Sequence, residues 1–144
     1  MQLASQKLLS TIALFEPRLR EISSAESARP AHGGWSYRQI LGHLIDSASN
    51  NHQRFVRAAL QPSLEFPRYD QNGNIEVQAV SAADWDLLIS LWLSYNRYLA
   101  HIIARLPAPQ LATPCRIGGA APVTLEFLVD DYLVHLTHHL DQLA

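Results

Sequence analysis

The chain has 144 residues, close to the usual size of one domain, so we expect a single domain spanning residues 1–144. Eleven Lys and Arg residues against thirteen Asp and Glu residues give a formal net charge of -2. This balance argues against a nucleic-acid partner, because binding phosphates requires clustered positive charge. The single cysteine excludes an internal disulfide and the cysteine-rich zinc folds. Seven histidines stand out, so histidine and carboxylate would have to hold any metal ion.

The apolar segments are too short to cross a membrane. The most apolar stretch, residues 87–96, contains Ser90 and Ser94, whereas a membrane-spanning helix needs about 20 consecutive, mainly apolar residues. Residues 1–7 show no basic region followed by an apolar core, so we expect no signal peptide. These features favour a soluble, cytoplasmic protein that has no membrane partner.

Helical periodicity marks four segments, which are separated by segments rich in proline and glycine. The first runs from about residue 4 to residue 22, with one stripe of apolar side chains three and four residues apart: Leu8, Ile12, Phe15, Leu19 and Ile22. Residues 23–34 are predicted to form a loop. The second helix begins near Ser36, a good N-cap, and Gln39 three residues later completes a capping-box pattern. It should end before Pro62, and its apolar stripe consists of Tyr37, Leu41, Leu44, Ala48 and Phe55.

A connection of about twenty residues, 61–80, follows the second helix. Because a short loop suffices between antiparallel neighbours, this long connection predicts that the second and third helices run parallel. The third helix begins after Ser81 and stops before Pro107, and its apolar stripe consists of Trp85, Leu88, Trp92, Tyr95, Leu99 and Ile102. Residues 107–122 are predicted to form a loop with at most a short hairpin, and no stretch shows sustained strand alternation. The fourth helix covers about residues 124–143, and the pattern predicts an all-α four-helix bundle.

Two histidines of the fourth helix share its inward side. At roughly 100° per residue, His139 lies within the apolar face and His135 lies at its edge one turn earlier, whereas His138 lies toward the polar side. Such a pair can bind one metal ion, with Zn–N distances of roughly 2.0–2.1 Å. The alternative is an ordinary polar helix end that happens to carry histidines. Two buried imidazoles need a partner for their polar atoms, however, and a metal ion provides one. The apolar face is centred on Leu125, Tyr132, Leu136 and Leu143.

The histidine pair requires a third ligand, and four histidines elsewhere in the chain are candidates. His43 lies on the flank of the second helix's apolar stripe and is the best placed. His52 is nearly three turns further along the same helix, and His101 follows the third stripe less well. His32 lies in the loop rich in proline and glycine. Position along the helices leaves these alternatives open.

Several polar side chains near these histidines are candidates for contacts around a metal site or for the lining of a pocket. Asp131, one turn before His135, could accept a hydrogen bond from the ring and fix its tautomer. Gln142, one turn beyond His139, could orient that ring. The alternative for the carboxylates is a solvated position on the bundle surface. The further candidates are Asp46, Asn50 and Arg54.

Two segments resemble signatures of the DinB/YfiT-like superfamily. Residues 35–47, WSYRQILGHLIDS, resemble its second-helix signature, and residues 135–143, HLTHHLDQL, resemble its C-terminal His-x-x-x-His motif followed by Gln. The order and spacing of the four predicted helices also fit, and residues 69–71 resemble a loop element of several members. The resemblance covers essentially the whole chain. One departure is residues 72–75, NGNI, where the hydrolase-like relatives are expected to carry a tryptophan.

The resemblance implies an up-down-down-up four-helix bundle with a divalent metal ion, zinc or nickel, at one end. It also implies that His43, His135 and His139 are the three metal ligands. Members are described as metal-dependent hydrolases, and some relatives are transferases or isomerases that use a low-molecular-weight thiol. A homodimer and a small-molecule substrate are further implications of the resemblance.

Three neutral imidazoles with an open coordination position form a catalytic type of zinc site. The open position could hold water, whose pKa zinc lowers to roughly 7, or a thiol, which the metal would deprotonate. The sequence therefore predicts a metal-dependent enzyme, either a hydrolase or a thiol S-transferase. Two other classes are a non-catalytic metal-binding stress or accessory domain and a purely structural helical domain that dimerises through an apolar helix face.

Overall fold

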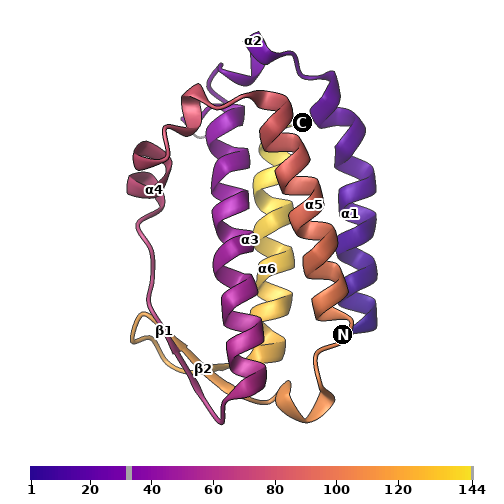
Figure 1. Ribbon diagram of the computed structural model, residues 1–144, viewed down its shortest axis with the longest axis vertical. Helices are drawn as coiled ribbons and strands as arrows, with labels where there is room; N and C mark the ends of the chain where they lie inside the picture. The colour runs from indigo at the N-terminus through magenta and orange to yellow at the C-terminus, as the bar shows by residue number, and fades with distance from the viewer. Residues whose placement is uncertain (32–33, 144) are drawn as a thin grey trace.

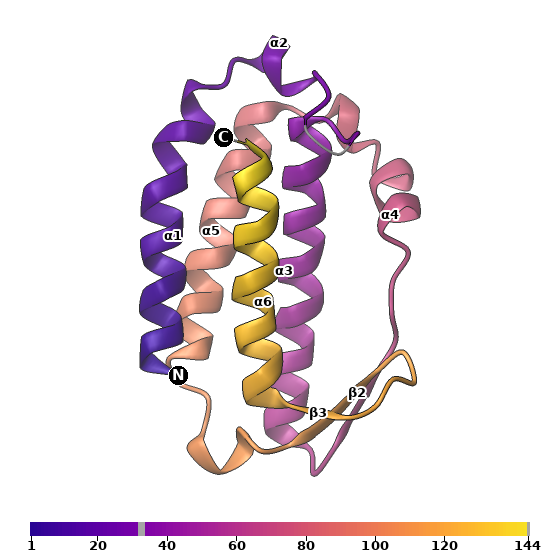
Figure 2. The ribbon, with the colours of Figure 1, turned by 180° about the vertical axis from the view of Figure 1, so that it is seen from behind.

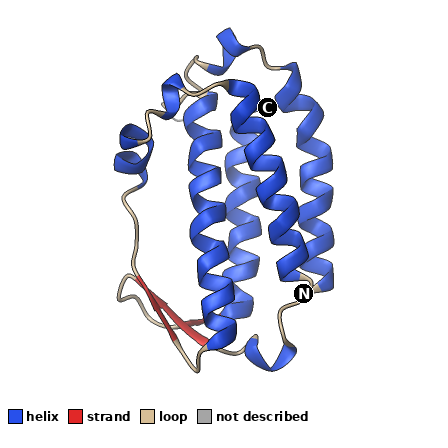
Figure 3. Ribbon diagram, in the orientation of Figure 1, coloured by secondary structure: helices blue, strands red, loops and turns tan. Residues whose placement is uncertain are grey.

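The computed structural model describes residues 1–31 and 34–143, in which four long helices stand above a small sheet (Figures 1 and 3). Each of these helices packs against two others, so that α1 and α3 both contact α5 and α6. α1 and α6 run upward in Figure 1, whereas α3 and α5 run downward. The predicted up-down-down-up bundle is therefore confirmed. Among the described residues, no helix is both long and apolar enough to cross a lipid bilayer. The long helices are α1 (Gln2–Glu21), α3 (Tyr37–Leu60), α5 (Trp85–Ile103) and α6 (Leu125–Leu140).

The capping box that we predicted for the second helix is present at the start of α3. The Ser36 Oγ accepts a hydrogen bond from the Gln39 N–H at 3.3 Å, and the Gln39 Oε1 accepts one from the Ser36 N–H at 2.8 Å. The predicted start of the third helix, after Ser81, was too early. α5 begins at residue 85 because the Asp84 carboxylate accepts a hydrogen bond from the Leu87 N–H at 2.8 Å.

The long connection between α3 and α5 runs back along the outside of the bundle, so these two helices are parallel as predicted (Figure 1). It contains the short helix α4 (Gln71–Val77), which we had predicted to be loop. Gly73 and two asparagines give this segment a low intrinsic helix propensity. Tertiary and capping contacts stabilise it instead: the Asp70 carboxylate accepts a hydrogen bond from the Gly73 N–H at 3.0 Å, and Ile75 is buried. A single-turn helix, α2 (Ser24–Ser27), likewise interrupts the first predicted loop.

A three-stranded sheet within the described residues closes the lower end of the bundle (Figure 2). Strand β1 (Leu64–Phe66) pairs in parallel with β2 (Pro114–Ile117), and β2 pairs antiparallel with β3 (Val123–Thr124). The β2–β3 pair is the predicted short hairpin. The sequence did not predict the sheet as a whole, because strands of two to four residues are too short to show a period of two.

The core occupies the centre of the bundle, where the predicted apolar stripes meet. Most of their members are buried, whereas Ile22, Tyr37, Tyr95 and Ile102 are only half-buried at the edges. The helical period therefore predicted the inward face of each long helix correctly. The buried members of the four stripes are Leu8, Ile12, Phe15, Leu19, Leu41, Leu44, Ala48, Phe55, Trp85, Leu88, Trp92, Leu99, Leu125, Tyr132, Leu136 and Leu143.

A buried polar contact joins α5 to α6 inside this core. The Tyr132 hydroxyl donates a hydrogen bond to the Asn96 Oδ1, and both residues are buried. Replacement Tyr132→Phe would leave that amide oxygen without a donor, so we expect the free energy of unfolding to fall by about 1–3 kcal/mol. Urea denaturation measures the change. Tyr98→Phe is the matched control because Tyr98 is 54% exposed, and equal effects of the two substitutions would contradict the prediction.

Candidate metal centre

Three histidines meet in the upper half of the bundle, between the first half of α3 and the last half of α6. His43 is 92 residues from His135 in the chain, yet their Nε2 atoms are 3.0 Å apart. His139 lies one turn after His135 and adds a third ring, and one nitrogen from each ring lies within 4.8 Å of the other two. Antiparallel packing of α3 on α6 therefore brings together the three histidines that the family resemblance singled out.

The three rings present their nitrogens to a common point. Their centroids are separated by 5.0, 4.7 and 4.6 Å, and their planes are inclined by 74°, 71° and 72° to one another. Ligand nitrogens about 2.0–2.1 Å from a tetrahedral zinc ion are about 3.3 Å apart, which is near the 3.0 Å between the first two Nε2 atoms. Two nitrogens at this distance cannot both carry a proton directed at the other. The cluster therefore suits a shared cation.

The outward nitrogens of two rings have polar neighbours that can hold a proton. The Nδ1 of His135 lies 3.4 Å from the Ser47 hydroxyl, and the Nδ1 of His139 lies 3.3 Å from the Gln142 Oε1. A proton on each Nδ1 would leave Nε2 as a free lone pair for a metal. Our sequence reasoning missed Ser47, although its position one turn after His43 was a signal. The Nδ1 of His43 is buried without a hydrogen-bond partner among the described residues.

The other polar candidates make different contacts. The Asp46 carboxylate accepts two hydrogen bonds from the Gln78 Nε2, at 3.0 and 3.1 Å, and so faces the crossover. Asn50 donates to the Asp46 carbonyl at 3.0 Å. Asp131 is exposed and lines the same cavity as His135. Within residues 1–31 and 34–143, none of these three side chains forms a hydrogen bond to a ring of the cluster.

An aromatic side chain that we had not assigned to the site packs beside the cluster. The indole of Trp35 stacks on the His139 ring at 6.2 Å between centroids and 22° between planes. It also lies 5.1 Å from the His43 ring, inclined by 52°. Its position just before the α3 capping box places it there. Trp35 therefore packs beside two of the three rings.

The other histidines that the structure describes do not join the cluster. His52 lies 3.1 Å from the Tyr95 hydroxyl, and His101 is exposed on α5. His138 is exposed, although its ring lies 5.2 Å from that of His139. His32 lies outside the described residues.

Burial keeps the clustered histidines in the neutral form that binds metals. Loss of hydration, followed by the nearby charges of His135 and His139, lowers the pKa of His43 to about 3. Burial, followed by the neighbouring His139 and His138, lowers the pKa of His135 to about 4. Burial also lowers the pKa of His139, and the contact with Gln142 opposes that shift. Protons therefore compete weakly with a metal ion at neutral pH.

These pKa shifts predict how the stability of the metal-free protein depends on pH. As the pH falls below about 6.5, histidines of the unfolded chain gain protons while His43 and His135 stay neutral. Neither histidine lowers the free energy of unfolding above about pH 6.5. Below that pH the free energy of unfolding falls by about 1.4 kcal/mol per pH unit for each histidine, down to about pH 4 for His135 and about pH 3 for His43. Urea denaturation with a chelator present measures the slope. The slope of the free energy of unfolding against pH should be the same in His101→Gln as in the wild type and smaller in His135→Gln. A wild-type free energy of unfolding that does not change with pH over this range would contradict the pKa shifts.

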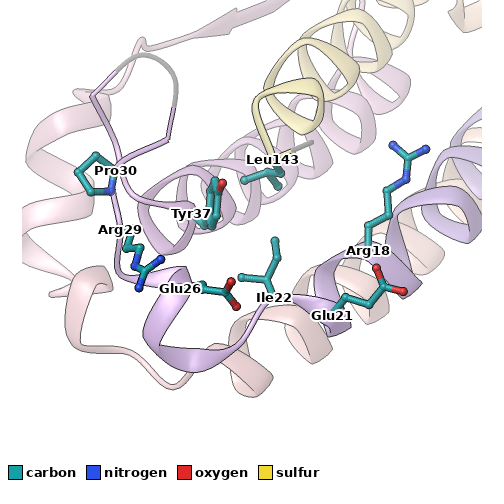
Figure 4. A pocket seen from close by; sticks show the side chains of 8 residues that line it. All are labelled: Arg18, Glu21, Ile22, Glu26, Arg29, Pro30, Tyr37 and Leu143. Atoms are coloured by element: carbon teal, nitrogen blue, oxygen red, sulfur yellow. The ribbon is translucent and has the colours of Figure 1, made fainter.

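A cavity of about 320 Å³ opens beside the cluster, and we call it the metal-side cavity. His135 forms part of its wall together with Ser47 and Tyr69. A different cavity of about 550 Å³ lies where the end of α1 meets α2 (Figure 4). None of the three clustered histidines lines that second cavity, so the metal-side cavity is the better place for a substrate. The residues that line the second cavity are Arg18, Glu21, Ile22, Glu26, Arg29, Pro30, Tyr37 and Leu143.

Comparisons with known proteins agree with the fold. A protein of Bacillus pumilus (strain SAFR-032) named "Putative metal-dependent hydrolase" is 27% identical over 128 residues, which cover 88% of this chain and 73% of that protein. The structure of YfiT from Bacillus subtilis, described as "a probable metal-dependent hydrolase with an unusual four-helix bundle topology", is similar with a TM-score of 0.85. The sequence identity is 22%, and the similarity covers 97% of this chain and 81% of that chain. The family model of the DinB superfamily matches residues 7–143. With that match over nearly its whole length, the chain belongs to the DinB superfamily.

Proposed function

We propose that the protein is a metal-dependent enzyme that binds one divalent ion, zinc or nickel, through His43, His135 and His139. The observation that carries the proposal is the convergence of three imidazole nitrogens within 4.8 Å of one another inside the bundle. Neutral imidazoles are ligands for both metals. Burying three such rings in an apolar bundle costs free energy unless a partner, such as a metal ion, satisfies their lone pairs.

The protein's own residues would orient the ligands and admit the substrate. Ser47 and Gln142 would accept hydrogen bonds from protons on the outward nitrogens, Trp35 packs beside the His139 ring, and His135 lines the metal-side cavity. When bound, zinc lowers the pKa of a coordinated water to about 7 and deprotonates a coordinated thiol. Three protein ligands leave a coordination position for that nucleophile.

We favour hydrolysis as the reaction, because the Bacillus pumilus relative is named a metal-dependent hydrolase. Thiol S-transfer at the same site is the second candidate. The thiol would have to come from outside the chain, since Cys115 is buried and donates to the Thr113 carbonyl at 3.4 Å. Burial also raises the pKa of the Cys115 thiol, which disfavours the nucleophilic thiolate.

Two assays of the metal-loaded protein separate these reactions. One measures hydrolysis of activated esters and amides, and the other measures transfer of a small thiol to a reactive electrophile. We expect one rate to exceed that of the metal-free protein and to be lost in His139→Ala. If the ion stays bound but neither rate exceeds the metal-free control, the protein is a non-catalytic metal-binding accessory domain, and the enzyme proposal is wrong.

The proposal includes three further properties, of which the small-molecule substrate and the homodimer are implied by the family resemblance. The protein would act on a small molecule, form a homodimer and reside in the cytoplasm. Analytical ultracentrifugation of the metal-loaded protein at several concentrations measures the oligomeric state. A monomer at every concentration would remove the dimer from the proposal and leave the metal centre in place.

A further inference from the structure

A third cavity adjoins the metal-side cavity, away from the histidine cluster. It has a volume of about 300 Å³ and lies between α6 and the β2–β3 hairpin, so we call it the hairpin-side cavity. Arg54, Arg68 and Asp131 line both cavities. A molecule that reaches from His135 into the hairpin-side cavity must therefore pass these three charged side chains. The other residues that line the hairpin-side cavity are Ile117, Ala120, Ala121, Val123, Phe127 and Leu128.

Arg54 carries a guanidinium whose hydrogen-bonding capacity is largely unused. Its Nε is buried without a partner, and its one hydrogen bond to a described residue is a long one to the Asn51 Oδ1, at 3.5 Å. It forms no ion pair within residues 1–31 and 34–143. The ring of Phe66 lies under the guanidinium at 5.2 Å and holds it in place. A half-buried cation with free donors is costly unless a ligand satisfies it.

The charges and the apolar residues of the two cavities define the kind of ligand that fits. Two arginines and one aspartate give the shared wall a net charge of +1, which complements a single carboxylate. A guanidinium is suited to bind a carboxylate with two parallel hydrogen bonds. Beyond the arginines, Ile117, Val123 and Phe127 offer an apolar surface. Each part of the wall thus matches a different part of an elongated ligand.

We propose that the substrate is a monocarboxylate with an apolar chain, whose carboxylate binds Arg54 and Arg68. Its apolar chain would occupy the hairpin-side cavity and its reacting group would lie at His135. The position of that reacting group rests on the proposed metal-dependent function, whereas the carboxylate site does not. The arginines would thus determine specificity and position the substrate.

Binding of hexanoate and of its neutral analogue hexanamide tests the proposal, with calorimetry on the metal-loaded protein. We expect hexanoate to bind at least about tenfold more tightly than hexanamide, because its carboxylate gains charge-assisted hydrogen bonds. Arg54→Gln should abolish this preference. Arg57→Gln is the matched control: Arg57 also lies over Phe66, at 5.9 Å, but is exposed and donates to Gln53.

A second variant, and the same binding measurement on metal-free protein, complete the test. Arg68 is exposed, so Arg68→Gln should fold even if Arg54→Gln does not, and it should also reduce the hexanoate preference. The proposal is overturned if hexanamide binds as tightly as hexanoate. It is also overturned if the preference survives in every folded arginine variant, since the carboxylate would then bind the metal instead. If the protein binds no metal but keeps an arginine-dependent preference, the carboxylate site stands and the proposed metal centre fails.

Discussion

The His139→Ala variant should bind a divalent ion at least about 100-fold more weakly than the wild type, and its metal-dependent activity should be lost. Removal of one of three imidazoles leaves two protein ligands, and even residues that only orient ligands contribute about 10–100-fold to metal affinity. His139 is only half-buried and lies in the last turn of α6. Its loss should therefore leave the bundle folded. Metal analysis after dialysis and circular dichroism measure the two effects.

His101→Ala is the matched control for this experiment. His101 is also a helical histidine, but it is exposed on α5 and does not belong to the cluster. The control should retain the ion and the activity of the wild type. His138→Ala adds a stricter comparison, because His138 neighbours His139 in sequence and is exposed. Retention of the full metal content by His139→Ala would show that the ion binds elsewhere.

Replacement of Phe55 by alanine should destabilise the protein by about 3–5 kcal/mol. Phe55 is 0% exposed and packs edge-on against Tyr132, with ring centroids 6.1 Å apart and planes inclined by 83°. This contact joins α3 to α6, the two helices that carry the clustered histidines. The substitution removes a large buried side chain and leaves a cavity that the neighbouring helices can only partly fill. The free energy of unfolding from urea denaturation measures the loss.

Phe127→Ala removes the same atoms from a side chain that is 52% exposed on α6. We expect this control to lose less than about 1 kcal/mol, because surface substitutions usually have small effects. A loss of similar size in both variants would contradict the packing described for Phe55. A small loss in both would show that α3 and α6 can close the space.

The helical framework could be predicted because its signals are local in sequence. Apolar side chains three and four residues apart define one face of a helix, and the pair Ser36 and Gln39 defines its start. The length of the connection 61–80 predicted that α3 and α5 run parallel. By contrast, α4 and the pairing of β1 with β2 depend on contacts between distant segments. No local pattern in such short elements reveals them.

The residues of the candidate site could likewise be predicted only in part from the sequence. Helical phase placed His135 and His139 on one side of a helix, but it left several candidates for the third ring. His43 was singled out by the family resemblance, since its approach depends on how α3 packs against α6. The contacts of Ser47 and Trp35 with the rings also depend on that packing.

The carboxylates show why a charged residue near a histidine in sequence is a weak predictor of contact. Asp131 lies one turn before His135, yet it lines the cavity wall that it shares with Arg54. Asp46 accepts hydrogen bonds from Gln78, which the crossover brings to it. Both placements are set by the crossover and the sheet, whose arrangement the sequence did not predict.

The metal content of wild-type protein purified without an affinity tag tests the central claim most directly. We expect about one divalent ion per chain, as a single three-histidine site requires. After removal of the ion with a chelator, added zinc or nickel should restore that stoichiometry and raise the thermal unfolding midpoint. Protein that carries no ion and gains no thermal stability from either metal would contradict the proposed metal centre.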